Sequence, residues 1–290
     1  MFLHPEKPEA LEAAAYFVGA LAQRGFITHV PAEDRERLQK ASPEARIEEL
    51  REDTPAELAV VFGGDGSVLR AAAWALPLQV PVLGVNLGHV GFLAELETSD
   101  IDDLLESVTG RKYSVEKRTV LEVKVHAGDE LRWHETAINE VSLEKAARER
   151  MLTVMVGIDG RPLSRWGCDG VLVSTPTGST AYAFSAGGPV VWPDVAAILV
   201  VPLSAHALFN RPMVLSPRSH VTMNLEQDPE QPGGVLWCDG RANYDLVPGE
   251  VVTVTSSAQH MLIARMKEQP FTTRLVKKFA LPVQGWGRRR

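Results

Sequence analysis

Cysteine is scarce in this chain of 290 residues, which contains only Cys168 and Cys238. The two do not form a Cys-x-x-Cys pair, so the sequence excludes a disulfide-stapled scaffold and a zinc ribbon. The eight histidines fall in no metal-ligand spacing either. We therefore expect no metal held by the chain itself, and we interpret both cysteines as small buried thiols of a protein from a reducing compartment.

Long apolar runs are also missing. The longest, Val195–Leu203, contains Pro202 and is far shorter than the ~20 residues that span a bilayer. The first residues, Met1–Glu6, do not show the basic segment and apolar stretch of a signal peptide. We therefore expect a cytoplasmic protein that does not use a membrane as a partner.

Positive charge is not in excess, because the formal net charge is −7. Proteins that bind nucleic acid need clustered lysine and arginine against the phosphates, and the only basic cluster is Arg288–Arg290. With 45% hydrophobic and 23% charged residues, the composition is that of an ordinary folded protein. We therefore expect small molecules, and no nucleic acid, as partners.

Several well-known catalytic motifs are absent. The Gly178–Thr180 stretch lacks the lysine of a P-loop, and no Gly-x-Gly-x-x-Gly or Ser/His/Asp nucleophile signature occurs. These absences exclude a P-loop nucleotide hydrolase, an NAD-dependent dehydrogenase and a serine hydrolase.

The chain contains instead two glycine-rich stretches, each with an aspartate close by: Gly63-Gly64-Asp65-Gly66, and Asp169-Gly170 followed by Thr175–Tyr182. Glycines let the backbone approach a phosphate, and amides at a helix start point at the anion. A carboxylate there repels phosphate unless it faces a hydroxyl that receives a phosphoryl group. The combination predicts a small-molecule kinase, while a second interpretation makes Asp65 a cap of the helix that begins near Ser67.

The first part of the chain alternates between helical and strand patterns, which is typical of an open parallel sheet with ligands at the carboxyl ends of its strands. Residues 31–55 predict a short surface helix or a mobile segment. The expected elements are a helix over 8–24, a strand over 58–62, a helix over 67–75, a strand over 81–85 and a helix near 100–107.

From about Val120 apolar and polar residues alternate, as at Leu121, Val123 and Val125, and Asp159-Gly160 is a hairpin-turn signal. We therefore predict a Rossmann-like α/β domain over 1–120 and a β-rich, β-sandwich-like domain over 121–268. Residues 269–290 are expected to form a helix that returns to the first domain.

In these motifs the chain resembles NAD kinases, above all the actinobacterial ones, which belong to the phosphofructokinase-like superfamily. The GGDG stretch alone is shared with phosphofructokinases and lipid kinases, whereas the Thr175–Tyr182 run with an upstream Asn-Glu pair is specific. The matching segments are Gly63–Gly66, Asn86–Leu93, Asn139-Glu140, Asp169–Tyr182, Ser185–Pro189 and Cys238–Arg241.

The resemblance implies transfer of a phosphoryl group to the 2′-hydroxyl of the adenosine ribose of NAD. The donor would be ATP or polyphosphate with Mg²⁺, and the protein would be a homodimer or homotetramer. Three departures stand out: Ser67 replaces the usual threonine, Leu203-Ser204 replaces two asparagines, and the chain begins at the first expected strand.

Carried over residue by residue, the resemblance makes Asp65 the catalytic group, which orients the ribose hydroxyl and accepts its proton. Gly63, Gly64, Gly66 and Arg70 would contact the donor phosphates, and Asn139 and Glu140 the ribose. The expected adenosine-binding residues are Thr177, Thr180, Ala181, Tyr182, Ala183, Phe184 and Ser185.

The resemblance also implies that Asp169 binds the other nucleoside, sometimes that of a neighbouring subunit. Some family members have arginine where this chain has Gly167, and the small residue predicts tolerance of NADH. Arg150 and Arg241 match further ligand-contact positions.

Two other functions stay open from the residues. A lipid or sugar kinase of the same superfamily would share the GGDG stretch, but a lipid substrate calls for an apolar cleft, and the Thr175–Ser185 stretch is polar. A regulator that binds NAD(H) without turnover would leave Asp65 without a role.

Overall fold

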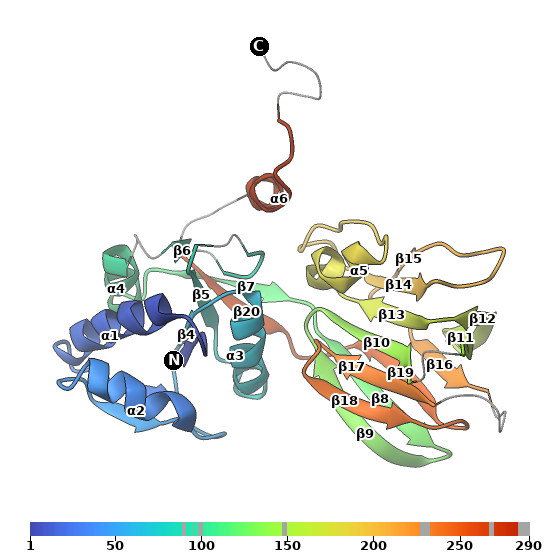
Figure 1. Cartoon of the computed structure of the whole chain (residues 1–290), viewed down its shortest axis with the longest axis horizontal. Helices are drawn as coiled ribbons and strands as arrows, with labels where there is room; N and C mark the ends of the chain where they lie inside the picture. Colours follow the sequence, from blue (N-terminus) through green and yellow to red (C-terminus); the bar gives the residue numbers. More distant parts are fainter. Residues whose placement is uncertain are drawn as a thin grey trace. The chain divides into compact units, whose positions relative to one another are not determined.

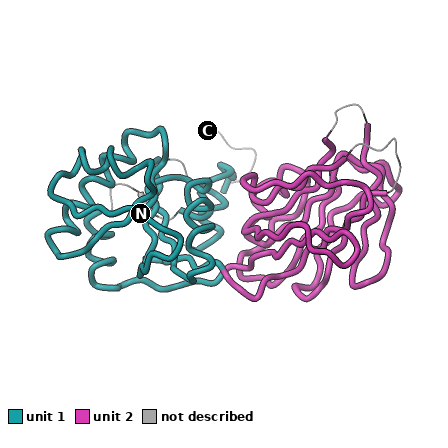
Figure 2. Tube along the Cα trace, turned by 90° about the horizontal axis from the view of Figure 1, so that it is seen from below, with its two compact units in different colours: residues 1–117, 261–290 teal, residues 118–260 magenta. Residues whose placement is uncertain are grey.

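The computed structural model describes residues 1–88, 91–94, 96–97, 101–146, 150–226, 233–266 and 270–283. The chain divides into two compact units (Figure 1), coloured separately in Figure 2. Unit 1 consists of residues 1–117 and 261–290, and unit 2 of residues 118–260. The boundaries expected from the sequence lie at 120 and 268.

Unit 1 is built on a six-stranded sheet in the order β1-β4-β5-β20-β7, with β6 beside β5. The pairs β1–β4, β4–β5, β5–β20 and β5–β6 are parallel. Its elements are β1 (Phe2–Leu3), α1 (Pro8–Ala22), β2 (Thr28–Val30), α2 (Ala32–Ala41), β3 (Ile47–Glu49), β4 (Ala59–Phe62), α3 (Asp65–Leu78), β5 (Val82–Asn86), β6 (Leu96–Glu97), α4 (Ile101–Thr109), β7 (Ser114–Arg118), β20 (Met261–Arg265) and α6 (Phe271–Phe279).

Every residue of β4 and β5 is buried, which explains why these strands appear in the sequence as continuous apolar runs. Helix α1 begins at Pro8, and Gly25 follows its end with φ of 80°. The predicted open parallel sheet with alternating helices is therefore confirmed.

The polar segment 31–55 is more regular than its sequence indicates. The expected short helix is α2, but the segment also contains β3, which pairs in parallel with β2. Strand β3 has three residues, too few to show an alternating pattern. The structure therefore supports the first alternative, a short helix.

Helix α6 belongs to unit 1 and contacts the segment that follows β5. The buried Arg274 side chain donates from Nη1 to the carbonyl oxygen of Phe92 at 2.9 Å. The rings of Phe271 and Phe279 lie 5.7 and 5.9 Å from the ring of Phe92, measured between centroids. These contacts tie the end of the chain to a motif in its first third.

Unit 2 contains two antiparallel six-stranded sheets, in the orders β15-β14-β13-β10-β17-β18 and β12-β11-β16-β19-β8-β9. Its elements are β8 (Leu121–Ala127), β9 (Glu130–Ala137), β10 (Glu140–Lys145), β11 (Leu152–Ile158), β12 (Arg161–Cys168), β13 (Gly170–Ser174), η2 (Thr177–Thr180), α5 (Tyr182–Ser185), β14 (Ile198–Leu203), β15 (Met213–Leu215), β16 (Val221–Leu225), β17 (Gly234–Cys238), β18 (Ala242–Leu246) and β19 (Val251–Ser256).

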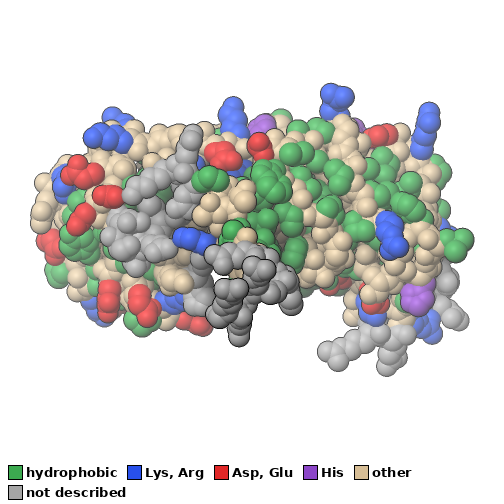
Figure 3. All heavy atoms as spheres, turned by 90° about the horizontal axis from the view of Figure 1, so that it is seen from above, with side chains coloured by type: hydrophobic (Ala, Val, Ile, Leu, Met, Phe, Trp, Pro, Cys, Tyr) green, Lys and Arg blue, Asp and Glu red, His purple; other side chains and the backbone are tan. Residues whose placement is uncertain are grey.

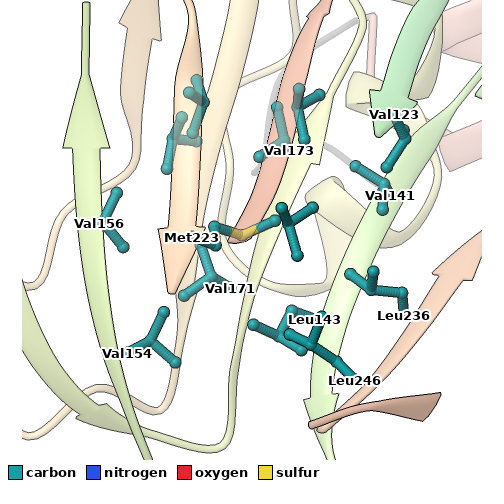
Figure 4. Packing of buried hydrophobic residues seen from close by; sticks show 14 of the residues in the cluster. Val123, Val141, Leu143, Val154, Val156, Val171, Val173, Met223, Leu236 and Leu246 are labelled. Atoms are coloured by element: carbon teal, nitrogen blue, oxygen red, sulfur yellow. The ribbon is translucent and has the colours of Figure 1, made fainter. Parts of the chain in front are cut away.

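One apolar core joins the two sheets of unit 2, as the side chains in Figure 4 show. Val154 and Val156 come from one sheet, and Val171 and Val173 from the other. Alternate residues of each strand point inward, which is the packing of a sandwich. The predicted β-sandwich-like fold is confirmed, and the Asp159-Gly160 pair forms the turn between β11 and β12 with φ of 53° and 75°.

On the face that Figure 3 shows, lysine and arginine side chains stand singly among acidic and hydrophobic ones. Among the helices of the described residues, none is both long and apolar enough to cross a bilayer.

Candidate functional site

The turn from β4 to α3 carries the first glycine-rich stretch. Strand β4 ends at Phe62 and α3 begins at Asp65, two residues earlier than the sequence predicted, with Gly64 at its N-cap position. The amide of Ser67 donates to the carbonyl of Gly64 at 3.0 Å. The carboxylate of Asp65 is directed to another segment, so the interpretation of Asp65 as a helix cap is wrong.

Two backbone amides hold the Asp65 carboxylate. The N–H of Phe92 donates to Oδ2 and the N–H of Leu93 to Oδ1, each at 3.0 Å. A Cβ on Gly91 would lie 2.3 Å from Oδ1, so only glycine permits this approach. The Asp65 side chain is half-exposed, and each oxygen keeps a lone pair for a further donor. His89 and Val90 of the predicted loop lie outside the described residues.

The glycines around Asp65 differ in their surroundings. A Cβ on Gly64 or Gly66 would meet no atom within 4 Å, so the backbone there borders open space. On Gly63 it would lie 2.5 Å from Ser67 Oγ, so this glycine is required by close packing. Because α3 starts at this turn, its first amides and its dipole favour an anion in that space.

Arg70 lies one turn further along α3. Its guanidinium donates to the carbonyl oxygen of Leu3, and Nη1 lies 4.0 Å from Glu33 Oε1. The predicted phosphate ligand is therefore held by Leu3 of β1, while its buried Nε is a donor without a hydrogen-bond partner.

The second group of predicted residues belongs to unit 2. The Asn139-Glu140 pair links β9 to β10, so Asn139 lies in the link and Glu140 begins the next strand. The carbonyl oxygen of Asn139 accepts from the N–H of Thr175 at 2.9 Å and from Ser174 Oγ at 3.0 Å. A Cβ on Gly178 would lie 2.1 Å from the same oxygen. The structure therefore brings the Asn-Glu pair and the Thr175–Tyr182 run into direct contact.

Asp239 is a site residue that the sequence did not single out. Its buried carboxylate accepts from the N–H groups of Ile138, Asn139 and Glu140 at 2.8, 2.7 and 3.2 Å. Its partners are backbone groups about a hundred positions earlier, so no side-chain pattern reveals the contact. The only signal in the sequence is the matching Cys238–Arg241 segment.

The Glu140 carboxyl is buried and unusually weakly acidic. Burial and, to a smaller extent, the charge of Asp239 raise its pKa to about 8, although the hydrogen bond from the backbone N–H of Tyr182 acts in the opposite direction. Among the described residues, Glu140 Oε2 and Thr177 Oγ1 are buried polar atoms without a hydrogen-bond partner. Buried polar groups normally form hydrogen bonds, so these two atoms indicate that a polar ligand binds here and completes theirs.

The raised pKa of Glu140 predicts a pH-dependent stability. Between the unfolded value near 4.5 and about 8, the folded protein keeps a proton that the unfolded chain has lost, so stability falls as the pH rises. Glu140→Gln cannot titrate and escapes this loss. We expect its Tm relative to the wild type to increase by about 7–14 °C between pH 5 and pH 8. A Tm difference that stays constant across this range, measured by calorimetry, would contradict a protonated Glu140 in the folded protein.

The predicted adenosine-binding residues form η2 and α5. Ser179, a residue of η2, forms hydrogen bonds with the backbone of Pro176 and Val191, which fixes the turn. Ala183 is fully buried, backbone included, so the structure does not support its predicted contact with the ligand. Of the other predicted residues, Tyr182, Phe184 and Ser185 are exposed, Thr180 and Ala181 half-buried and Thr177 buried.

Asp169 lies at the start of β13, where Lys145 Nζ contacts its Oδ1 at 2.5 Å. The Lys145 contact lowers the pKa of this exposed carboxyl, and the Ser204 hydroxyl also donates to it. A Cβ on the nearby Gly167 would meet only Met151 Cε, at 3.8 Å. The space beside Gly167 is therefore open to a larger side chain or a ligand.

The two remaining predicted arginines differ in their placement. Both are exposed residues, but Arg241 has Nη2 3.7 Å from the buried Asp239 Oδ2 and a side chain that is 31% exposed. No group of three histidine, cysteine or acidic side chains among the described residues could hold a metal ion. Cys168 and Cys238 are buried and unpaired.

Comparison with known proteins identifies the family. Residues 1–113 match the ATP-NAD kinase N-terminal domain and residues 138–266 the ATP-NAD kinase C-terminal domain. The NAD kinase of Cutibacterium acnes is 54% identical over 98% of this chain and 89% of that protein. That of Thermobifida fusca is 48% identical over 99% of this chain and 90% of that protein.

Solved structures agree with the sequence relatives. Yeast NADH kinase complexed with NADH matches with a TM-score of 0.85 and 27% identity, over 96% of this chain and 85% of that one. An NAD kinase from Archaeoglobus fulgidus in complex with ATP matches with a TM-score of 0.65 and 25% identity, over 88% of this chain and 98% of that one. The resemblance inferred from the motifs is confirmed, and the chain belongs to the NAD kinase family.

Proposed function

We propose that the chain transfers a phosphoryl group from ATP or polyphosphate to the 2′-hydroxyl of the adenosine ribose of NAD(H). The observation that carries this proposal is the Asp65 carboxylate, fixed by the N–H groups of Phe92 and Leu93 at a turn of open glycines. The relatives complexed with NADH and with ATP support the same pair of substrates.

In this reaction Asp65 orients the ribose hydroxyl and accepts its proton. Phosphoryl transfer passes through a loose transition state, so the proton can leave late and positioning contributes more than basicity. Two amides fix the Asp65 carboxylate, and the remaining lone pairs can face the hydroxyl. The amides that begin α3 stabilise charge on the donor phosphates.

The nucleoside contacts are assigned to unit 2. Glu140 Oε2 and Thr177 Oγ1 are buried and without partners, so ribose or base groups would complete their hydrogen bonds. The exposed rings of Tyr182 and Phe184 offer stacking faces to the base. Asp169, held by Lys145, would bind the second nucleoside.

The metal, the location and the assembly are part of the proposal. Mg²⁺ would enter with the donor, because it prefers phosphate oxygens and keeps several of its waters. Two unpaired cysteines support a cytoplasmic protein. We infer a homodimer or homotetramer from the family resemblance, and sedimentation equilibrium would measure it.

One assay tests the proposed reaction. The protein is incubated with NAD and either MgATP or polyphosphate, and the NADP formed is measured with an NADP-specific dehydrogenase. A lipid or sugar kinase would leave NAD unchanged in this assay, and it would consume ATP only when a lipid or a sugar is supplied as the acceptor. A regulator would bind NAD in calorimetry but form no NADP with either donor, and that result would refute the proposal.

The open space at Gly167 predicts that NADH is phosphorylated as well as NAD. A Cβ there meets only Met151 Cε at 3.8 Å, so a side chain can leave the backbone at Gly167 without a clash at its first atom. We expect Gly167→Arg to lower kcat/KM for NADH by about tenfold, while the KM for ATP changes less than about twofold. Chromatographic separation of NADPH and NADP measures both products. A wild type that makes NADP but no NADPH would remove the prediction.

A further inference from the structure

We propose that Asp239 is a positioning residue of the NAD site, which acts on the substrate through Asn139 and Glu140 without touching it. The inference rests on the proposed function, since it assigns a role to residues that would bind the nucleoside. It is carried by the convergence of three consecutive backbone N–H groups on one buried carboxylate.

The hydrogen bonds clamp the link between β9 and β10. Asp239 Oδ2 accepts from Ile138, and Oδ1 accepts from both Asn139 and Glu140, at 2.8, 2.7 and 3.2 Å. In the opposite direction, the N–H of Asp239 donates to the carbonyl oxygen of Glu140 at 3.0 Å. Bonds from N–H groups to a charged acceptor are stronger than neutral ones. The link is therefore fixed before any ligand arrives.

The link between β9 and β10 is also held by hydrogen bonds from the segment around Thr175. The Asn139 carbonyl oxygen accepts from Thr175 N and Ser174 Oγ, and Gly178 packs against the same group. Asn139 thus lies between the Asp239 carboxylate and the Thr175–Tyr182 run. The Asp239 side chain has no exposed surface, so any effect it has on a ligand must pass through Asn139 and Glu140.

Asp239 also places a second carboxylate beside Glu140. Arg241 lies 3.7 Å from Asp239 Oδ2, and the backbone N–H of Tyr182 donates to Glu140. The buried Cys238 thiol also faces the pair, and burial together with the charges of Asp239, Glu135 and Glu140 raises its pKa. Burial and the charge of Asp239 both raise the pKa of Glu140. A protonated Glu140 can donate a hydrogen bond to a ribose oxygen, which a carboxylate cannot.

The chain contains a matched control. Asp159, like Asp239, precedes a glycine, has positive φ (53° against 51°) and bonds a backbone N–H, that of His220 at 2.8 Å. It also accepts from Ser219 Oγ at 3.3 Å. The turn that it stabilises carries no predicted ligand residue, so Asp159→Asn reports the general effect of losing such a carboxylate.

The experiment compares Asp239→Asn with Asp159→Asn. An asparagine keeps one acceptor oxygen but turns an amino group toward one of the three donors, so the link loosens. We expect the Kd for NAD, measured by calorimetry, to rise about 30-fold in Asp239→Asn and less than about twofold in Asp159→Asn. The KM for ATP should stay within about twofold in both. Unchanged NAD binding, or an equal loss in both variants, would overturn the proposal.

The pH profile adds a measurement that a purely structural role would not affect. In Asp239→Asn, one cause of the raised pKa of Glu140 is gone, so the inflection of kcat/KM for NAD is expected at lower pH. In Asp159→Asn it should not move. A profile of Asp239→Asn that superimposes on the wild type would count against the proposal.

Hydrogen exchange on the wild type covers the case in which Asp239→Asn does not fold. The amides of Asn139 and Glu140 should be protected before NAD is added, and rapid exchange would overturn the proposal. Failure of the proposed function gives a different result. A wild type that binds NAD but forms no NADP would refute the reaction, while the binding comparison would still decide the role of Asp239.

Discussion

Asp65→Asn should lower kcat for NADP formation by about a thousandfold or more and change the Kd for NAD by less than about threefold. Asparagine cannot accept the ribose proton. Its amino group would also face the N–H of Phe92 or Leu93, so the side chain would leave its present orientation. Stopped assays of NADP and calorimetry of NAD binding measure the two quantities separately.

The control for this variant is another aspartate of unit 1. Asp102 on α4 accepts a hydrogen bond from the Tyr16 hydroxyl at 2.8 Å and has no predicted contact with substrate. Asp102→Asn should therefore keep kcat within about twofold. If Asp65→Asn retained wild-type turnover, Asp65 would have no role in the chemistry, and the proposed mechanism would fail.

The second large effect is expected from Gly178→Ala. A Cβ at this position would lie 2.1 Å from the carbonyl oxygen of Asn139 and 2.6 Å from Ser174 Oγ. The first obstacle is backbone, which cannot move without breaking the bonds that Asn139 accepts. We expect the free energy of unfolding to fall by about 3 kcal/mol, with a Tm lower by about 6–12 °C and NAD binding reduced at least tenfold.

Gly167→Ala is the matched control for stability in the same unit. Its Cβ would meet only Met151 Cε, at an ordinary contact distance of 3.8 Å, so its Tm should change by less than about 2 °C. Calorimetric scans of both variants make the comparison. If Gly178→Ala were as stable as Gly167→Ala, the link between β9 and β10 at Asn139 would be able to move. That result would contradict the rigid link inferred above.

The sequence indicated the strand-to-helix turn at Asp65 because buried parallel strands and glycine-rich turns leave strong local patterns. It could not show that the Asp65 carboxylate is held by the amides of Phe92 and Leu93. Almost every residue has a backbone N–H, so the residue types do not indicate which amides bind a carboxylate. For the same reason the sequence alone is compatible with Asp65 as a helix cap. It also does not indicate that Asp239 binds the backbone of residues 138–140.

The sequence does not predict strand β9, and the cause is different. Strand β9 carries mostly charged and polar residues on both faces near its start, where Glu130, Leu131 and Arg132 are all exposed. An alternating pattern arises only where one face is buried, so this part of β9 carries none. Strands such as β8 and β11, whose alternate residues enter the core, were evident from the sequence.

The position of β20 has a consequence for the order in which the protein can be assembled. In the sheet order it lies between β5 and β7, yet its residues follow all of unit 2 along the chain. A nascent chain can complete the sandwich as soon as residue 260 leaves the ribosome. Until Met261–Arg265 follows, β5 presents unpaired backbone groups to the cell, so chaperones would have the most to protect in the half of the protein that is translated first.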